Sequence, residues 1–331
     1  MRHVLFAIAI LVCLTMAGIA SSAVADERPR QSVATTVSGL DGEQQSLKFW
    51  APEDADKTPT PLFVFLHSWS SDYQQDNSKW LVECVRRNWI WIHPDFRGIN
   101  ESPKACGSKF ARHDILEAIR FAREKWNVDS ERVYLAGVSG GGHMSLLMAG
   151  HHPEQFSAVS SWVGPNDLIE WHRFHTKNGQ PEKYAKMIEA SLGGPPGTSS
   201  QIDADYRDRS PVFHLQNAKG VPISIWAGVE DGHTGSVPVS HSLRAFNVLA
   251  EAQGDLPVSE LEIMQLSLHK RLKAPQASDR VENVVLGRKI YLHRTSGRSV
   301  VTIFEGGHES IPEAAFEWLE RQQKMTAGQQ P

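Results

Sequence analysis

Short apolar runs separated by amphipathic stretches dominate the chain after about residue 60. The runs are apolar on both faces, which predicts buried strands. They span residues 61–66, 89–93, 132–136, 158–163, 222–227 and 299–304. Between the early runs, the stretches at 77–87 and 111–126 carry apolar residues at helical spacing. This alternation predicts an α/β fold with a mostly parallel, twisted sheet and helices on both of its faces.

Three segments depart from the alternation. The stretches 33–37 and 46–50, joined by a turn at Asp41-Gly42-Glu43, predict an antiparallel strand pair at one edge. Residues from about 165 to 219 are polar and rich in turn residues, and we expect them to form a small helical cap. Residues from about 254 to 298 form a late insertion.

The end of the insertion has a sequence pattern that predicts its structure. Residues 289–293 and the turn that follows them predict a hairpin into the last strand. We therefore expect one domain over residues 26–331, with the cap and the insertion attached to a single sheet.

One short motif predicts chemistry. Ser139 lies at the centre of Gly137-Val138-Ser139-Gly140-Gly141, after an apolar run and before the helix-like stretch 143–149. A strand, then G-x-S-x-G, then a helix is the nucleophile elbow, in which a sharp turn exposes the serine Oγ at a helix N-terminus. The alternative is a glycine-rich turn with an ordinary N-cap serine.

A serine nucleophile needs a base, and the base needs an orienting acid. In α/β sheets, sites lie beyond the carboxyl ends of the strands. Asp231 follows the next-to-last parallel strand, and His308 follows the last one. The chain order Ser139, Asp231, His308 is the order of the α/β-hydrolase fold, so these three residues are the predicted catalytic triad.

Other residues compete for these roles. Glu230 and Asp167 are alternative acids, the first beside Asp231 and the second after an earlier strand. His233 and His143 are alternative bases, although His233 lies close to Asp231 in sequence and a histidine at position 143 is more often packed in a helix.

Backbone N–H groups near Ser139 are expected to stabilise an oxyanion. The first is that of Gly140, and the second comes from the loop after the first parallel strand, with Trp69 preferred to Ser68. Aromatic and histidine side chains from this loop, the cap and the Asp231 loop are candidates for the substrate pocket. They are His67, Trp171, Phe174, His175 and His233.

Composition narrows the function further. The formal net charge is −4, and the basic residues are scattered along the chain, which argues against a nucleic-acid partner. Gly140-Gly141-Gly142 lacks the lysine and hydroxyl residue of a phosphate loop, and His151-His152 lacks the i, i+4 spacing of a helical zinc site. We expect no cofactor and no metal.

The first 25 residues predict a secretory signal peptide, because a short apolar stretch follows Arg2 and ends in Ala23-Val24-Ala25. We therefore expect a periplasmic or secreted protein that has no membrane contact after cleavage. Cys84 and Cys106 are then an even pair in an oxidising compartment, and we expect a disulfide worth about 3 kcal/mol. The alternative is two buried free thiols.

These motifs, with Ser210-Pro211, Val237-Pro238 and Gly307-His308, resemble the catalytic domain of the prolyl oligopeptidase family of serine peptidases. The resemblance covers about residues 58–323 apart from the insertion. The segment before it is too short for the β-propeller of large members. The family often has Tyr-Gly-Gly or His-Gly-Gly at the oxyanion loop, where this chain has His67-Ser68-Trp69.

The resemblance implies a serine peptidase that acts on short peptides. An exported carboxylesterase acting on acetyl or feruloyl-type esters is the alternative, with the same triad. A non-catalytic binding module on the same fold is a third hypothesis. The sequence leaves the oligomeric state open.

Overall fold

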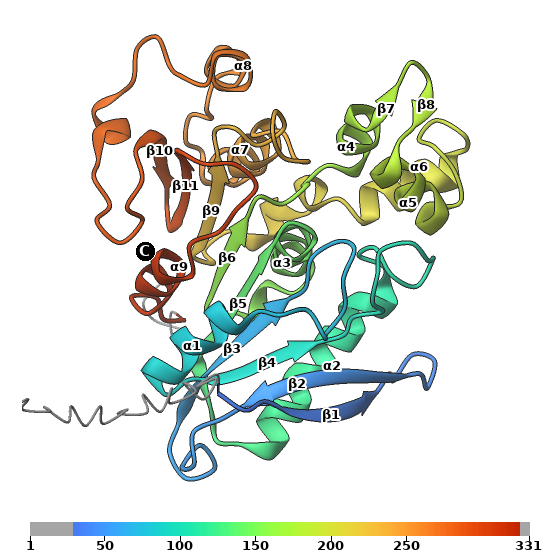
Figure 1. Ribbon diagram of the computed structural model, residues 1–331, viewed down its shortest axis with the longest axis vertical. Helices are drawn as coiled ribbons and strands as arrows, with labels where there is room; N and C mark the ends of the chain where they lie inside the picture. Colours follow the sequence, from blue (N-terminus) through green and yellow to red (C-terminus); the bar gives the residue numbers. More distant parts are fainter. Residues whose placement is uncertain (1–28, 325–331) are drawn as a thin grey trace, which may run out of the picture.

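The computed structural model describes residues 29–324, so the predicted signal peptide lies outside the described residues. Within this range, nine strands form one sheet in the order β1-β2-β4-β3-β5-β6-β9-β11-β10 (Figure 1). The strands from β4 to β11 in this order pair in parallel, and antiparallel pairs flank them at both ends. The prediction of a mostly parallel sheet is confirmed.

The strands lie close to the predicted apolar runs. Every residue of β3, β4, β6, β9 and β11 is buried, as expected for strands covered on both faces. The strands are β1 (Ser32–Val37), β2 (Gln44–Trp50), β3 (Thr60–Leu66), β4 (Ile90–Pro94), β5 (Val128–Val138), β6 (Ala158–Trp162), β9 (Ile223–Gly228), β10 (Ile290–Ser296) and β11 (Ser299–Phe304).

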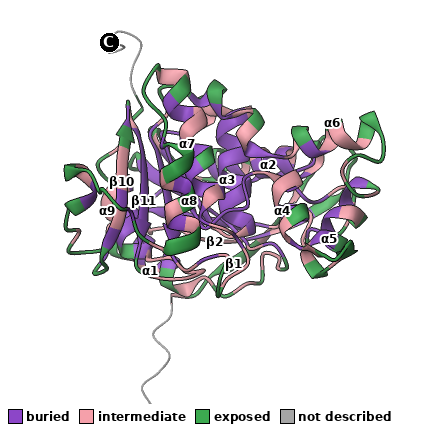
Figure 2. Cartoon of the chain, turned by 90° about the horizontal axis from the view of Figure 1, so that it is seen from above, coloured by how far each residue is buried: buried purple, intermediate pink, exposed green. Residues whose placement is uncertain are grey.

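Helices cover both faces of the sheet (Figures 1 and 2). The helices α1 (Ser78–Arg87) and α9 (Pro312–Leu319) contact each other on one face. The helices α2 (Lys109–Lys125), α3 (Gly140–His151) and α7 (Ser240–Gln253) cover the other. Figure 2 shows that α3 is buried along its length, because the sheet lies on one side of it and the segments returning from the cap on the other.

The cap and the insertion are two lobes beside the sheet (Figure 1). The cap holds α4 (Leu168–Phe174), the pair β7 (Thr176–Lys177) and β8 (Gln180–Pro181), α5 (Lys183–Leu192) and α6 (Ser200–Asp208). It has its own hydrophobic cluster, which includes Trp69, Trp171 and Tyr206. The insertion holds α8 (Glu260–His269) and ends in the predicted hairpin of β10 and β11.

The disulfide expected between Cys84 and Cys106 is not formed, and both thiols are free and buried. Cys84 lies on α1 in the main core, whereas Cys106 packs in the cap cluster, so the two side chains belong to different parts of the interior. Burial raises the pKa of Cys106 to about 12 and that of Cys84 well above its ordinary value. Both thiols are therefore unreactive at neutral pH.

None of the helices between residues 29 and 324 has the length and apolar character needed to cross a membrane.

Candidate active site

Ser139 occupies the sharp turn between β5 and α3. Its φ of 59° and ψ of −118° are strained for a residue with a side chain. Two backbone hydrogen bonds hold the turn: Ser139 N–H donates to the Trp162 carbonyl at 2.8 Å, and His143 N–H donates to the Ser139 carbonyl at 2.9 Å. The predicted nucleophile elbow is thus present in its geometry.

The glycines of the motif are required by close backbone approach. A Cβ atom on Gly137 would lie 2.3 Å from the carbonyl carbon of Gly141, and one on Gly141 would lie 2.1 Å from the Leu66 carbonyl oxygen. Any side chain at either position would push the strand and the helix apart.

Two backbone N–H groups face the Ser139 turn. A Cβ atom on Gly140 would lie 2.3 Å from the Trp69 nitrogen, so these two residues are in direct backbone contact. The Gly140 N–H opens helix α3 and has no partner within the helix. The Ser68 N–H donates to Gln75 Oε1 at 2.8 Å, whereas the Trp69 N–H has no acceptor within residues 29–324. Trp69 is therefore the better second oxyanion donor.

Asp231 and His308 are joined directly. His308 Nδ1 lies 2.8 Å from Asp231 Oδ2, and the Asp231 side chain is almost completely buried. The other carboxylate oxygen accepts the N–H groups of Gly232 at 3.0 Å and Val237 at 3.1 Å. Because Nδ1 donates its proton to Asp231, the lone pair of His308 lies on Nε2, the atom needed for a general base.

The loops that carry the acid and the base are fixed to each other. Val229 N–H donates to the Phe304 carbonyl at 2.8 Å, and Glu230 N–H donates to the Gly306 carbonyl at 2.9 Å. A Cβ atom on Gly228 would lie 2.3 Å from the Gly307 carbonyl oxygen, so this contact depends on glycine. The spacing of the acid and the base is therefore set by backbone.

Ser139 follows β5 at the same edge of the sheet from which β9 leads to Asp231 and β11 to His308. Its Oγ has no hydrogen-bond partner among the described residues. In unliganded enzymes such bonds are often long and tighten when substrate is bound. The arrangement has the parts of an acyl-transfer site.

The model of the Prolyl oligopeptidase family matches residues 109–285, which is more than half of the chain. The chain belongs to the prolyl oligopeptidase family. The resemblance predicted from the motifs is confirmed.

Relatives of this family member include peptidases and esterases. The chain is 27% identical over 165 residues to the uncharacterized peptidase YtmA of Bacillus subtilis. The aligned region covers 49% of this chain and 58% of YtmA. It is 40% identical over 50 residues to an acetylxylan esterase of Coprinopsis cinerea, over 15% of this chain and 13% of the esterase. The matched part thus spans less than two thirds of either relative.

Solved structures support the fold. The acylaminoacyl peptidase of Pyrococcus horikoshii superposes with a TM-score of 0.58 and 17% sequence identity, over 90% of this chain and 42% of that one. At this level of identity the likeness shows the shared α/β-hydrolase fold and leaves the substrate open.

The alternative acids of this prolyl oligopeptidase family member have other partners. Glu230 forms an ion pair with Lys270. Asp167 caps α4, where its Oδ1 accepts the N–H groups of Ile169 at 2.9 Å and Glu170 at 3.1 Å. Neither side chain contacts His308.

The alternative bases are also bound elsewhere. His143 is buried, its Nε2 lies 2.7 Å from the Arg209 carbonyl oxygen, and burial lowers its pKa to about 4. The Nε2 atom of His233 lies 2.7 Å from the Ser267 carbonyl oxygen. Both histidines bridge elements of the fold, and His308 is the one that contacts a carboxylate of the predicted triad.

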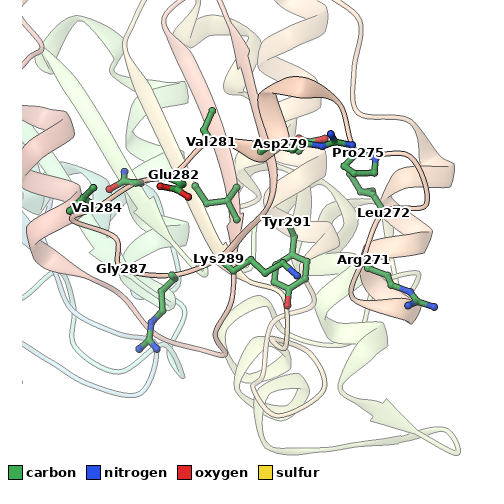
Figure 3. A pocket seen from close by; sticks show the side chains of 14 residues that line it. Arg271, Leu272, Pro275, Asp279, Val281, Glu282, Val284, Gly287, Lys289 and Tyr291 are labelled. Atoms are coloured by element: carbon green, nitrogen blue, oxygen red, sulfur yellow. The ribbon is translucent and has the colours of Figure 1, made fainter.

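A cavity of about 580 Å³ lies beside Asp231. Its walls come from α4, the loop at 231–233, α7 and the end of α8, and they include the predicted pocket residues Phe174 and His233. A cavity of about 620 Å³ lies in the insertion, where Lys289 extends over the ring of Tyr291 (Figure 3). Of these two cavities only the first has a triad residue, Asp231, in its walls, while Ser139 and His308 are not among its lining residues, so it is a candidate for a subsite beside the triad.

The other three predicted pocket residues are placed differently. His67 is completely buried and stacks on Phe96 with ring centroids 3.8 Å apart, so the prediction that it lines the pocket is wrong. Trp171 and His175 are also buried, and Trp171 Nε1 and His175 Nε2 each lie 2.8 Å from the Ser236 carbonyl oxygen. These two residues hold the loop that carries Asp231.

Gly235 is a site residue that the sequence analysis did not identify. A Cβ atom there would lie 2.2 Å from Asp231 Oδ1 and 2.6 Å from His308 Cβ. The only signal for it in the sequence is a second glycine between Asp231 and Val237-Pro238.

Replacing Gly235 by alanine is expected to separate Asp231 from His308 and to lower kcat by about 100-fold or more, because displacements near 1 Å have effects of this size. Hydrolysis of p-nitrophenyl acetate measures the loss. Gly39→Ala is the control, since its new methyl group would meet mainly the flexible tips of His113 and Glu117. Wild-type turnover in Gly235→Ala would show that the pair tolerates displacement.

Proposed function

We propose that this protein is a serine hydrolase that works through an acyl-enzyme. Ser139 is the nucleophile, His308 the general base and Asp231 the acid that orients it. The observation that carries the proposal is the 2.8 Å contact between His308 Nδ1 and Asp231 Oδ2, at the sheet edge where Ser139 lies on a strained turn. The family membership supports the same reading.

The proposed reaction follows from the placement of these groups. Ser139 Oγ attacks the substrate carbonyl carbon while His308 Nε2 accepts the hydroxyl proton. The buried Asp231 carboxylate stabilises the imidazolium that forms. The carbonyl oxygen becomes an oxyanion, which accepts hydrogen bonds from the N–H groups of Gly140 and Trp69.

Collapse of this intermediate breaks the bond to the leaving group, which takes the proton from His308. The acyl group is then an ester of Ser139. A water molecule, deprotonated by His308, attacks this ester, and the second intermediate collapses to release the acid and restore the Ser139 hydroxyl. Both halves of the reaction use the same donors and the same base.

We place short peptides first among the substrates. The family model and a peptidase relative that matches half of the chain support this choice. The cavity beside Asp231 has room for a side chain of moderate size, and the cap helix α4 forms one of its walls.

An ester substrate is the second candidate, favoured by the 40% identity to an acetylxylan esterase over 50 residues. The mechanism is the same for both classes. They differ in the leaving group, because an amine must be protonated as it departs and an alkoxide much less so.

A substrate panel separates the two candidates. We expect the protein to hydrolyse acyl-proline and acyl-alanine p-nitroanilides with a kcat/KM within about 100-fold of that for p-nitrophenyl acetate, since a peptidase protonates the departing amine efficiently. Turnover of esters alone would establish the esterase. Failure of a fluorophosphonate probe to label Ser139 would contradict both and indicate a binding module.

A further inference from the structure

We propose a zinc-binding site formed by His151, Asp208 and His214, where the end of helix α3 meets the segment returning from the cap. One ligand atom from each side chain lies within 4.8 Å of the others. His151 ends α3, Asp208 ends α6, and His214 joins the 3-10 turns η2 (Pro211–Phe213) and η3 (Leu215–Ala218).

The distances suit a metal ion after a small closure. His151 Nε2 lies 3.9 Å from Asp208 Oδ1, and the two imidazole rings have centroids 4.1 Å apart. Zinc binds histidine nitrogen and carboxylate oxygen at about 2.0–2.2 Å, which places neighbouring ligands about 3.4 Å apart in a tetrahedron. Side-chain movements of about 1 Å therefore complete three ligands, and water supplies the fourth.

The backbone around the cluster favours a cation. Helix α3 of the central domain and helix α6 of the cap both end there, and a helix C-terminus carries partial negative charge. The Asp208 carbonyl oxygen lies 3.2 Å from His151 Nε2, and the Arg207 carbonyl oxygen lies 3.1 Å from His214 Nε2. These carbonyl groups accept the Nε2 protons and hold both rings at the end of α6, so coordination through Nε2 moves the imidazole proton to Nδ1.

The positive charge of Arg112 opposes cation binding at this cluster. Its guanidinium donates to Asp208 Oδ2 at 3.0 Å and to Oδ1 at 3.4 Å. A carboxylate has about four acceptor positions, so it can accept these bonds and still coordinate a metal. The positive charge nearby lowers the affinity, and we expect weaker binding than in a site closed by four protein ligands.

The backbone at the site is already tightly packed. A Cβ atom on Gly150 would lie 2.7 Å from His214 Cβ, and Asn217 Nδ2 donates to the Gly150 carbonyl at 3.2 Å.

Helix α3 separates the cluster from Ser139 by about 18 Å, at 1.5 Å per residue. A metal here would tie the cap to α3 and act on stability, without contact with the reacting atoms.

The test uses the full mature chain without a polyhistidine tag, freed of metal by a chelator. Titration with ZnCl₂ in a calorimeter is expected to show one equivalent per chain. At one hundred times the Kd, the melting temperature should rise by about 5 °C. His151→Gln and His214→Gln should each weaken binding at least tenfold, whereas hydrolysis of p-nitrophenyl acetate should not change on metal removal.

His152→Gln is the matched control, because His152 is adjacent in sequence and its nearest acidic group is Glu154 at 3.9 Å. It should bind zinc like the wild type. Asp208→Asn is a third variant that removes a ligand. Circular dichroism of the metal-free variants shows whether each one is folded, and so separates loss of a ligand from loss of the fold. Absence of one-to-one binding, or equal weakening by His152→Gln, would overturn the proposal.

Discussion

Replacing Ser139 by alanine is expected to lower turnover of any accepted ester or amide by about 10⁴- to 10⁶-fold. The substitution removes the attacking oxygen and leaves the backbone of the elbow as it is, because alanine keeps the Cβ atom that serine already holds at φ 59°. The melting temperature should therefore change little. Rates of p-nitrophenyl acetate hydrolysis and a thermal unfolding curve measure the two effects.

Ser70→Ala is the matched control for this variant. Ser70 is exposed in the oxyanion loop, next to Trp69, and its hydroxyl has only a long contact, 3.8 Å, with the Met187 sulfur. It should retain wild-type turnover and fluorophosphonate labelling, whereas Ser139→Ala should lose both. If Ser139→Ala kept more than a few per cent of turnover, the nucleophile would be another residue.

The second large effect is expected for Asp231→Asn, with a fall in kcat of about 10³- to 10⁴-fold. The amide oxygen can still accept the N–H groups of Gly232 and Val237, which leaves the amide NH₂ facing His308 Nδ1. Nδ1 then becomes an acceptor and Nε2 carries the proton. In that tautomer His308 cannot accept the proton of Ser139.

Two controls separate this effect from a general loss of charge. Glu230→Gln removes the neighbouring carboxylate, which pairs with Lys270, and should leave kcat within a few-fold of wild type. Asp167→Asn tests the other alternative acid and should chiefly affect the N-terminus of α4. A larger fall in kcat for either control than for Asp231→Asn would move the orienting acid to that residue.

The cap contributes to the site through its contacts with the acid loop. Trp171 and His175 hold the Ser236 carbonyl, and the next N–H along the chain, that of Val237, donates to Asp231. The packing of α4 is therefore coupled to the position of the carboxylate. This coupling explains why Trp171 and His175 are buried, whereas Phe174 lines the cavity beside Asp231.

Much of the architecture follows from local patterns in the sequence. Apolar runs such as 61–66 and 299–304 predict the strands, because a strand covered on both faces needs apolar side chains at every position. The elbow at Ser139 is predicted because its motif is local, with Gly137 and Gly141 in close contact within five residues. Asp231 and His308 are found because parallel strands bring their carboxyl ends to one edge.

Other features depend on contacts that the pattern of apolar residues and the order of the motifs do not show. The sequence favours Trp69 over Ser68 as the second oxyanion donor, and the structure supports this order because the Ser68 N–H already donates to Gln75 Oε1. Gly235 is required because both the Asp231 carboxylate and His308 lie against it. Cys84 and Cys106 form an even pair that the packing places in separate clusters.

The contact between His151 and His214 is the clearest example of one that the sequence does not predict. These residues are 63 positions apart, and they meet because the segment returning from the cap packs on α3. The periodicity of apolar residues indicates which side chains of a segment are buried, and the order of the motifs indicates the edge of the sheet at which the segment ends. They contain no information on which loops meet across that edge. The sequence alone thus determined the fold class and the candidate triad through local burial and strand order, whereas packing between remote segments decided the pocket walls and the meeting of His151, Asp208 and His214.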